Sequence, residues 1–177
     1  MDLRIIKTRN SIRKAFLKLR AKNSLERIRV TELCQIAIIN KTTFYKHYQD
    51  IYALSEEIED ETIKSIMDSF KNINSLFSDP YNFVKGFYHA FKSQEKIILI
   101  LFSGRINVLI DKIERRLKSH YSALKSDPET DILMSFLFRG AAQVLIKSKY
   151  DETILLDTVA DITRQIIVSL DLRNTAS

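Results

Sequence analysis

Residues 41–47 combine positive charge, hydroxyl groups and aromatic rings at helical spacing. In a helix, Phe44 and Tyr48 lie four positions apart and turn to one buried side. The opposite side then carries no acid, and its members are Lys41, Thr42, Thr43, Tyr45, Lys46 and His47. Lysines neutralise phosphates, and threonines contact phosphate oxygens or thymine methyl groups. The set therefore suits contact with DNA, while a solvated helix face is the alternative that its composition leaves open.

Two short helices joined by a tight turn would position these side chains. The first helix has apolar residues at helical spacing: Leu33, Ile36 and Ala37. Residues 38–40 are left for the turn. We expect Asn40 to cap the second helix and Asp50 to cap the next, because a short side-chain oxygen accepts from the first-turn amides. The second helix is then only about two turns long.

The segment TTFYKHYQDIYAL resembles the signature of the third and fourth helices in the TetR/AcrR family of bacterial transcription regulators. The matching positions are Thr43, Phe44, Tyr45, His47, Tyr48, Asp50, Ala53 and Leu54. Upstream residues look like the first helix and the start of the second: Arg9, Ile12, Ala15, Phe16, Leu19, Ile28, Val30 and Leu33. The resemblance covers about the first 60 residues, and beyond them it extends only to architecture.

The resemblance implies roles for individual residues. It assigns phosphate contacts to Thr43, Tyr45, His47 and, near the start of the second helix, Thr31. It assigns base or backbone contacts to Lys41, Thr42 and Lys46. It makes Phe44 and Tyr48 the packing anchors of the helix.

Two positions depart from the family pattern. Ile38 stands where the family usually has glycine, and a β-branched residue is uncomfortable at positive φ. We therefore expect a distorted turn or another backbone conformation there. Ile51 stands where the family frequently has lysine, which removes one phosphate contact. Basic residues near the N-terminus would replace it.

The charge distribution supports the same class of partner. Residues 1–50 contain 12 lysines and arginines against 4 acidic residues, a net charge of +8, whereas residues 51–177 have a net charge of −2. A one-sided basic segment is typical of nucleic-acid-binding proteins and predicts steep salt dependence. The alternative is a basic helix that serves solubility alone.

Composition favours an all-α fold, because 177 residues include only three glycines and two prolines, and helical spacing along the chain divides it into about nine helices. We expect a helix-turn-helix DNA-binding domain over residues 1–50, extending into the start of the fourth helix, and a helical regulatory and dimerisation domain over residues 51–177. The longest apolar run, residues 97–102, is far below the roughly 18 residues of a membrane span. The N-terminus lacks the apolar region of a signal peptide. We therefore predict a cytoplasmic protein with no membrane partner.

Helical spacing predicts further helices over residues 50–76, 81–92, 95–101, 105–124 and 128–149, and a last one after Asp151. Aromatic residues of the middle helices could line a cavity for a small apolar or aromatic effector, as the resemblance implies: Phe83, Phe87, Tyr88, Phe91, Phe102 and Tyr121. Plain core packing is the alternative, because packing alone produces such spacing.

The last two helices carry wide apolar stripes. One stripe follows a cap at Asp127 and comprises Leu133, Phe136, Leu137, Gly140, Ala141, Val144 and Leu145. The other comprises Leu155, Val159, Ile162, Ile166 and Leu170. Two such helices from each of two chains would form a four-helix dimer interface. The alternative is that both helices only close the intramolecular core.

No motif indicates catalysis. Paired carboxylates with histidine, nucleophile motifs and phosphate loops are missing at recognisable spacing, so we expect neither an enzyme nor a cofactor. Cys34 is the only cysteine, which excludes an intramolecular disulfide, and we expect a buried, inert thiol rather than a redox sensor. The sequence thus predicts a dimeric repressor that binds a pseudo-palindromic operator in double-stranded DNA and is released by an effector. The alternative is a helical small-molecule-binding protein without DNA-binding activity.

Overall fold

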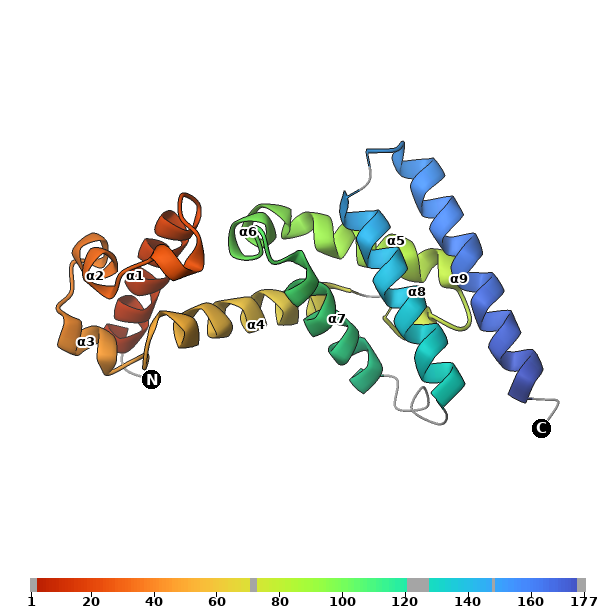
Figure 1. The fold of residues 1–177 in the computed structure, drawn as a ribbon, viewed down its shortest axis with the longest axis horizontal. Coiled ribbons are helices and arrows are strands. Elements are labelled where there is room, and N and C mark those ends of the chain that lie inside the picture. The colour runs from red at the N-terminus through yellow and green to blue at the C-terminus, as the bar shows by residue number, and fades with distance from the viewer. Residues whose placement is uncertain (1–2, 71–72, 121–127, 148, 175–177) are drawn as a thin grey trace. The chain divides into compact units, whose positions relative to one another are not determined.

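The computed structural model describes residues 3–70, 73–120, 128–147 and 149–174 (Figure 1). These residues form nine α-helices and two 3-10 helices without a strand, which confirms the predicted all-α fold. The α-helices are α1 (Leu3–Arg20), α2 (Val30–Ala37), α3 (Lys41–Tyr45), α4 (Ile51–Ser69), α5 (Pro80–Ser93), α6 (Glu95–Leu101), α7 (Ile106–His120), α8 (Pro128–Lys147) and α9 (Glu152–Asn174). Across the described ranges, no helix has the length and apolar character needed to span a membrane.

The chain divides into two compact units. The first unit comprises Met1–Lys64 and Gln94–Gly104, and therefore holds α1 to α3, most of α4, and α6. The second unit comprises Ser65–Ser93 and Arg105–Ser177, with α5 and α7 to α9. Each unit is built around its own apolar side chains. The predicted functional boundary at residue 50 stays a prediction.

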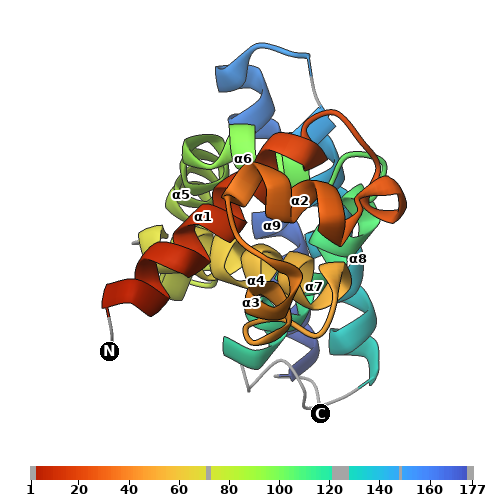
Figure 2. The ribbon, with the colours of Figure 1, turned by 90° about the vertical axis from the view of Figure 1, so that its left-hand side faces the viewer.

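The core of the first unit joins helices α1 to α4, whose ribbons are labelled in Figure 2. Its fully buried side chains come from α1, α2, α3 and α4 and include Ile12, Phe16, Leu33, Phe44 and Leu54. The predicted caps are confirmed, because the Asn40 side chain accepts from the Thr43 amide at 2.7 Å and the Asp50 side chain accepts from the Ala53 amide at 2.8 Å. Cys34 is buried as predicted, and burial raises the pKa of its thiol.

The turn between α2 and α3 corrects one expectation. Ile38 adopts φ 57° and ψ 49°, the left-handed conformation that glycine favours, so the turn keeps its ordinary geometry despite the β-branched residue. Its amide donates back to the carbonyls at the end of α2, and the Ile39 amide bonds the Cys34 carbonyl at 3.0 Å. The side chain of Ile38 is 90% exposed. Helix termination therefore prevails here over the backbone preference of the residue.

Helix α4 ends earlier than predicted. It stops at Ser69 instead of continuing to residue 76, and the Ser69 hydroxyl donates to the Ile66 carbonyl at 2.9 Å. Serine and asparagine side chains compete for backbone groups in this way, which favours helix ends. Helix α6 has the predicted bounds. The predicted cap Asp127 and the predicted end of α7 at residue 124 lie outside the described residues.

The second unit packs α5 against α9, α9 against α8, and α8 against α7. Aromatic rings fill part of its core, with the Phe70 and Phe83 centroids 4.9 Å apart in an edge arrangement. Asp151 caps α9 by accepting from the Thr153 amide at 2.9 Å. The apolar stripes predicted on α8 and α9 are divided between core and surface, because Leu137 and Leu155 are buried whereas Phe136 and Ile162 are exposed.

Candidate nucleic-acid interface

Helix α3 is held by its two predicted anchors. Phe44 is fully buried and Tyr48 almost so, and their ring centroids lie 5.8 Å apart. The helix spans five residues, which is shorter than the two turns predicted. The chain then continues as a turn, in which the His47 amide donates to the Phe44 carbonyl at 2.9 Å. Buried anchors, rather than helix length, therefore fix this element.

The structure brings the predicted DNA-contacting residues onto accessible surface. Those with exposed side chains are Thr31, Lys41, Thr42, Tyr45 and Lys46, and those half-exposed are Thr43 and His47. The Tyr45 ring packs edge-on against Phe44 at 5.4 Å, which orders an aromatic side chain that is otherwise open to solvent. Thr31 lies in the first turn of α2. Cations, hydroxyl groups and a phenol therefore lie on the accessible surface of one short segment and its neighbouring helix.

The first turn of α4 adds a residue that the sequence analysis missed. Ile51 is buried, so an apolar side chain there contributes to the core where the family pattern has lysine. Tyr52 follows it and is 56% exposed. The spacing of buried Ile51 and Leu54 could have indicated that Tyr52 points outward. Its phenol is a further hydrogen-bond donor available beside the predicted set.

Two arginines of α1 are engaged within the molecule. Arg9 pairs with Glu57 of α4, with Nη2 2.5 Å from Oε2, and Arg13 pairs with Glu61 one turn further along both helices. The hydrogen bond with Glu57 raises the pKa of Arg9, although burial opposes it. These two cations therefore do not serve freely as the replacement phosphate contacts expected near the N-terminus. Exposed lysines of the same helix, such as Lys14 and Lys18, carry no such pair among the contacts described.

Arg20 at the end of α1 is buried instead of facing solvent. Its side chain donates to the carbonyl oxygens of Asn23, Leu101 and Ser103 at 3.0, 3.1 and 3.0 Å. The guanidinium thus binds the C-terminal end of α6, where carbonyl groups lack partners in the helix itself. The spacing of four between Arg20 and buried Phe16 agrees with this position on the core side of α1.

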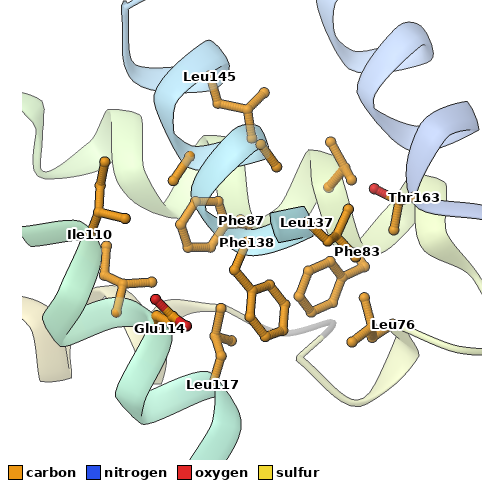
Figure 3. A pocket seen from close by; sticks show the side chains of 14 residues that line it. Leu76, Phe83, Phe87, Ile110, Glu114, Leu117, Leu137, Phe138, Leu145 and Thr163 are labelled. Atoms are coloured by element: carbon orange, nitrogen blue, oxygen red, sulfur yellow. The ribbon is translucent and has the colours of Figure 1, made fainter. Parts of the chain in front are cut away.

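The second unit contains a small apolar cavity (Figure 3). Its volume is about 30 Å³, and its walls include Phe83, Phe87, Phe138 and Leu117. Space of this size holds about one water molecule and no aromatic effector. Among the described members of the predicted effector-binding set, Phe83 and Phe87 line this cavity. Tyr88 and Phe91 belong to the same helix, α5, and are buried, but they do not line the cavity.

The remaining two members of that predicted set lie elsewhere. Phe102 belongs to the first unit, and Tyr121 lies outside the described residues. Of the five members that the structure describes, four therefore lie in the second unit, and two of these line its cavity. Helical spacing identified buried aromatic residues correctly, but it carried no information on which unit each one joins.

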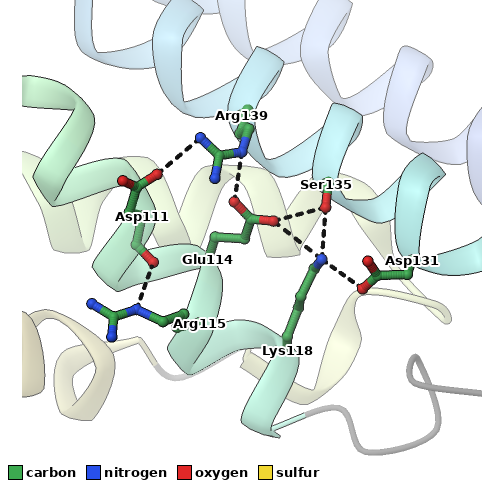
Figure 4. A network of polar contacts seen from close by, with 7 residues as sticks. All are labelled: Asp111, Glu114, Arg115, Lys118, Asp131, Ser135 and Arg139. Atoms are coloured by element: carbon green, nitrogen blue, oxygen red, sulfur yellow. Dashed lines mark hydrogen bonds and ion pairs between the residues drawn. The ribbon is translucent and has the colours of Figure 1, made fainter. Parts of the chain in front are cut away.

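A polar cluster borders the cavity between α7 and α8 (Figure 4). The Glu114 carboxylate accepts from the Ser135 hydroxyl at 2.8 Å and pairs with Lys118 at 3.2 Å and Arg139 at 2.7 Å. Burial acts to lower the pKa of Lys118, but its hydrogen bonds with Asp131 and Glu114 raise it overall. The cluster ties α7 to α8 and compensates a carboxylate that is only 8% exposed.

Apolar side chains are also exposed along α8 and α9. A groove of about 410 Å³ lies between these helices. Its walls include Phe136, Gly140, Val144, Ile154 and Ile162, and Phe136 is 71% exposed. Other members of the predicted stripes are buried in the core, namely Leu137, Leu145, Leu155 and Val159. A Cβ at Gly140 would meet no other atom within 4 Å, so this part of the helix faces open space.

No protein-family model matches this chain, and no curated protein matches it either. Among solved structures, it is similar to a transcriptional regulator of the TetR/AcrR family from Aquifex aeolicus VF5, at 19% identity and a TM-score of 0.48, with 93% of this chain and 98% of the other covered. It is also similar to the dihydroxyacetone kinase operon activator DhaS, at 18% identity and a TM-score of 0.41, with 94% and 95% covered. The all-helical architecture of the described residues agrees with the all-α fold predicted from the sequence.

Proposed function

We propose that the chain is a DNA-binding transcription regulator of the TetR family. The observation that carries the proposal is α3 itself, a short helix anchored by Phe44 and Tyr48 that leaves Lys41, Tyr45 and Lys46 exposed. The surrounding segment has a net charge of +8 over residues 1–50. A helix in the major groove contacts base edges through its N-terminal residues and phosphates through neighbouring cations and hydroxyl groups. The outward side chains supply both kinds of group.

The regulator works as a symmetric dimer through α8 and α9. The groove between these helices exposes Phe136, Ile154 and Ile162, and an apolar surface of this kind favours a protein partner. A second copy of the chain offers the same surface, as a two-fold interface requires. Two copies would place their α3 helices in major grooves roughly one DNA turn, about 34 Å, apart on a pseudo-palindromic operator.

Repression relieved by a small effector is the regulatory outcome we propose. The effector would bind in the second unit beside Phe83 and Phe87, and the cavity there must open because it holds only about 30 Å³. An effector shifts DNA affinity only if it binds one of the two conformations better. Cytoplasmic localisation accompanies this role.

Selection of binding sites from random duplexes by the purified full chain tests DNA binding. We expect an enriched sequence with two-fold symmetry, and binding that weakens steeply with added salt. Lys46→Ala and Tyr45→Ala should each weaken binding by about tenfold or more without unfolding the protein. Lys147→Ala is the matched control, because Lys147 is an exposed lysine at the end of α8. Equal affinity of Lys46→Ala and Lys147→Ala for the enriched site would contradict the proposal.

The dimer has its own test. Phe136→Glu places a charge in the apolar groove and should convert the protein to a monomer in sedimentation velocity runs. Leu99→Glu changes an apolar residue of the first unit that is 60% exposed, and should leave the mass unchanged. A wild-type monomer at micromolar concentration would refute the dimer. The alternative function, small-molecule binding without DNA activity, predicts instead that no duplex is enriched.

A further inference from the structure

Three segments of the first unit meet at the carboxylate of Glu57. Glu57 lies in α4, and its Oε1 accepts from the Tyr48 hydroxyl at 2.8 Å. Its Oε2 accepts from Arg9 of α1 at 2.5 Å. The Arg9 guanidinium also lies over the Tyr48 ring, 5.6 Å from its centroid. Both carboxylate oxygens are therefore engaged, one by the turn that follows α3 and one by α1.

The position of α3 depends on such contacts because the helix is too short to be stable alone. It has five residues, and isolated helices of that length do not persist in water. Burial of Phe44 holds α3 against the core, but apolar burial is not directional and so fixes the orientation of the helix only weakly. The Tyr48 hydroxyl bond adds a directed contact just beyond its C-terminal end. Loss of this bond would allow α3 to rotate or shift.

We propose that Glu57 is a positioning residue for DNA recognition, an inference that rests on the proposed DNA binding. It orients α3 through Tyr48, and it keeps Arg9 neutralised within the protein. Accurate placement of α3 favours specific over non-specific binding, because base contacts need accurate geometry. Neutralising Arg9 instead weakens attraction to the phosphates of any duplex, and so lowers the salt dependence of both kinds of binding. Glu57 itself places a negative charge beside the basic segment, so direct attraction to DNA cannot account for its position.

The same helices provide a matched control. Arg13 and Glu61 form an ion pair one turn away between α1 and α4, and Glu61 makes no hydrogen bond to Tyr48 among the contacts described. Glu57→Ala and Glu61→Ala each remove one carboxylate from the same face of α4. Their difference therefore isolates the contact with Tyr48 from a general tie between the helices.

The experiment compares affinity for a selected duplex with affinity for a scrambled duplex of equal length, in the full chain over a series of salt concentrations. Glu57→Ala should lower the ratio of specific to non-specific affinity by about tenfold, the size expected for a hydrogen bond to a charged group. It should also steepen the salt dependence, because Arg9 becomes free. Tyr48→Phe should lower the ratio similarly with no change in the salt slope.

Two further variants sharpen the test. Glu57→Gln keeps an oxygen that can accept from Tyr48, so it should restore most of the ratio while retaining the steeper salt slope. Glu61→Ala should change the ratio by less than about twofold. The inference is overturned if Glu61→Ala lowers the ratio as much as Glu57→Ala, or if Tyr48→Phe leaves the ratio unchanged. Failure of the wild-type chain to select any duplex would instead overturn the proposed function.

Discussion

Replacement of Ile38 by glycine should stabilise the protein. Ile38 has φ 57°, and the left-handed conformation costs a residue other than glycine about 1–2 kcal/mol. Its side chain is 90% exposed, so its removal sacrifices little buried apolar surface. Glycine loses more backbone freedom than isoleucine on folding, and this entropy cost offsets roughly 0.5–1 kcal/mol of the relieved strain. The balance is a stabilisation of about 0.5–1 kcal/mol.

Urea denaturation followed by circular dichroism measures this difference in the full chain. Ile38→Gly should move the transition midpoint to higher urea with an unchanged slope. Ile38→Val keeps the β-branched side chain in the same conformation and should leave the midpoint nearly unchanged. A midpoint for Ile38→Gly equal to or below that of the wild type would refute the account of strain at this turn.

Three other substitutions test separate parts of the structure. Phe44→Ala should destabilise the protein by about 3–5 kcal/mol in the same denaturation assay, because Phe44 is fully buried, and a loss below about 1 kcal/mol would contradict its role as an anchor. Arg20→Met retains the side-chain stem but leaves carbonyl groups of residues 101 and 103 without a donor, so hydrogen exchange in residues 94–104 should accelerate; unchanged exchange would show that these carbonyls need no guanidinium. Burial and the hydrogen bond to Glu57 raise the pKa of Tyr48 to about 12. A pKa raised in the folded state gives stability that is present below the ordinary tyrosine pKa and is lost as pH rises toward 12, so Tyr48→Phe should flatten the decline in stability above pH 10. An equal decline in both proteins would count against that shift.

Local signals predicted the elements well. Asn40 and Asp50 cap the helices that follow them as predicted, because a short side-chain oxygen next to an apolar period is a signal confined to a few residues. The inward positions of Phe44 and Tyr48 followed from their spacing of four. Caps and helical spacing involve residues within about one turn of each other, so the sequence alone contains what is needed to predict them.

Long-range contacts were less predictable. The bonds from Arg20 to residues 101 and 103 join positions more than 80 apart, and no local pattern distinguishes this arginine from an exposed one except its helical phase. Glu57 stands among the five acidic residues of positions 56–61, a local pattern that does not reveal that its partners come from α1 and from the turn after α3. Phe102 shared aromatic character with Phe83 and Phe87 but belongs to the other unit. The positions of the helices could be predicted from the sequence, but which distant residues contact one another, and which unit each residue joins, could not.

The discontinuous make-up of the first unit governs how this protein could be divided or recombined. Residues 94–104 belong to that unit, although residues of the second unit precede and follow them in the chain. A fragment that ends at Lys64 would omit the α6 carbonyl groups that accept from Arg20 and would leave a guanidinium in an apolar setting short of two acceptors. A chimera that grafts the first unit onto a foreign second unit therefore needs an α6 equivalent as well as the N-terminal helices.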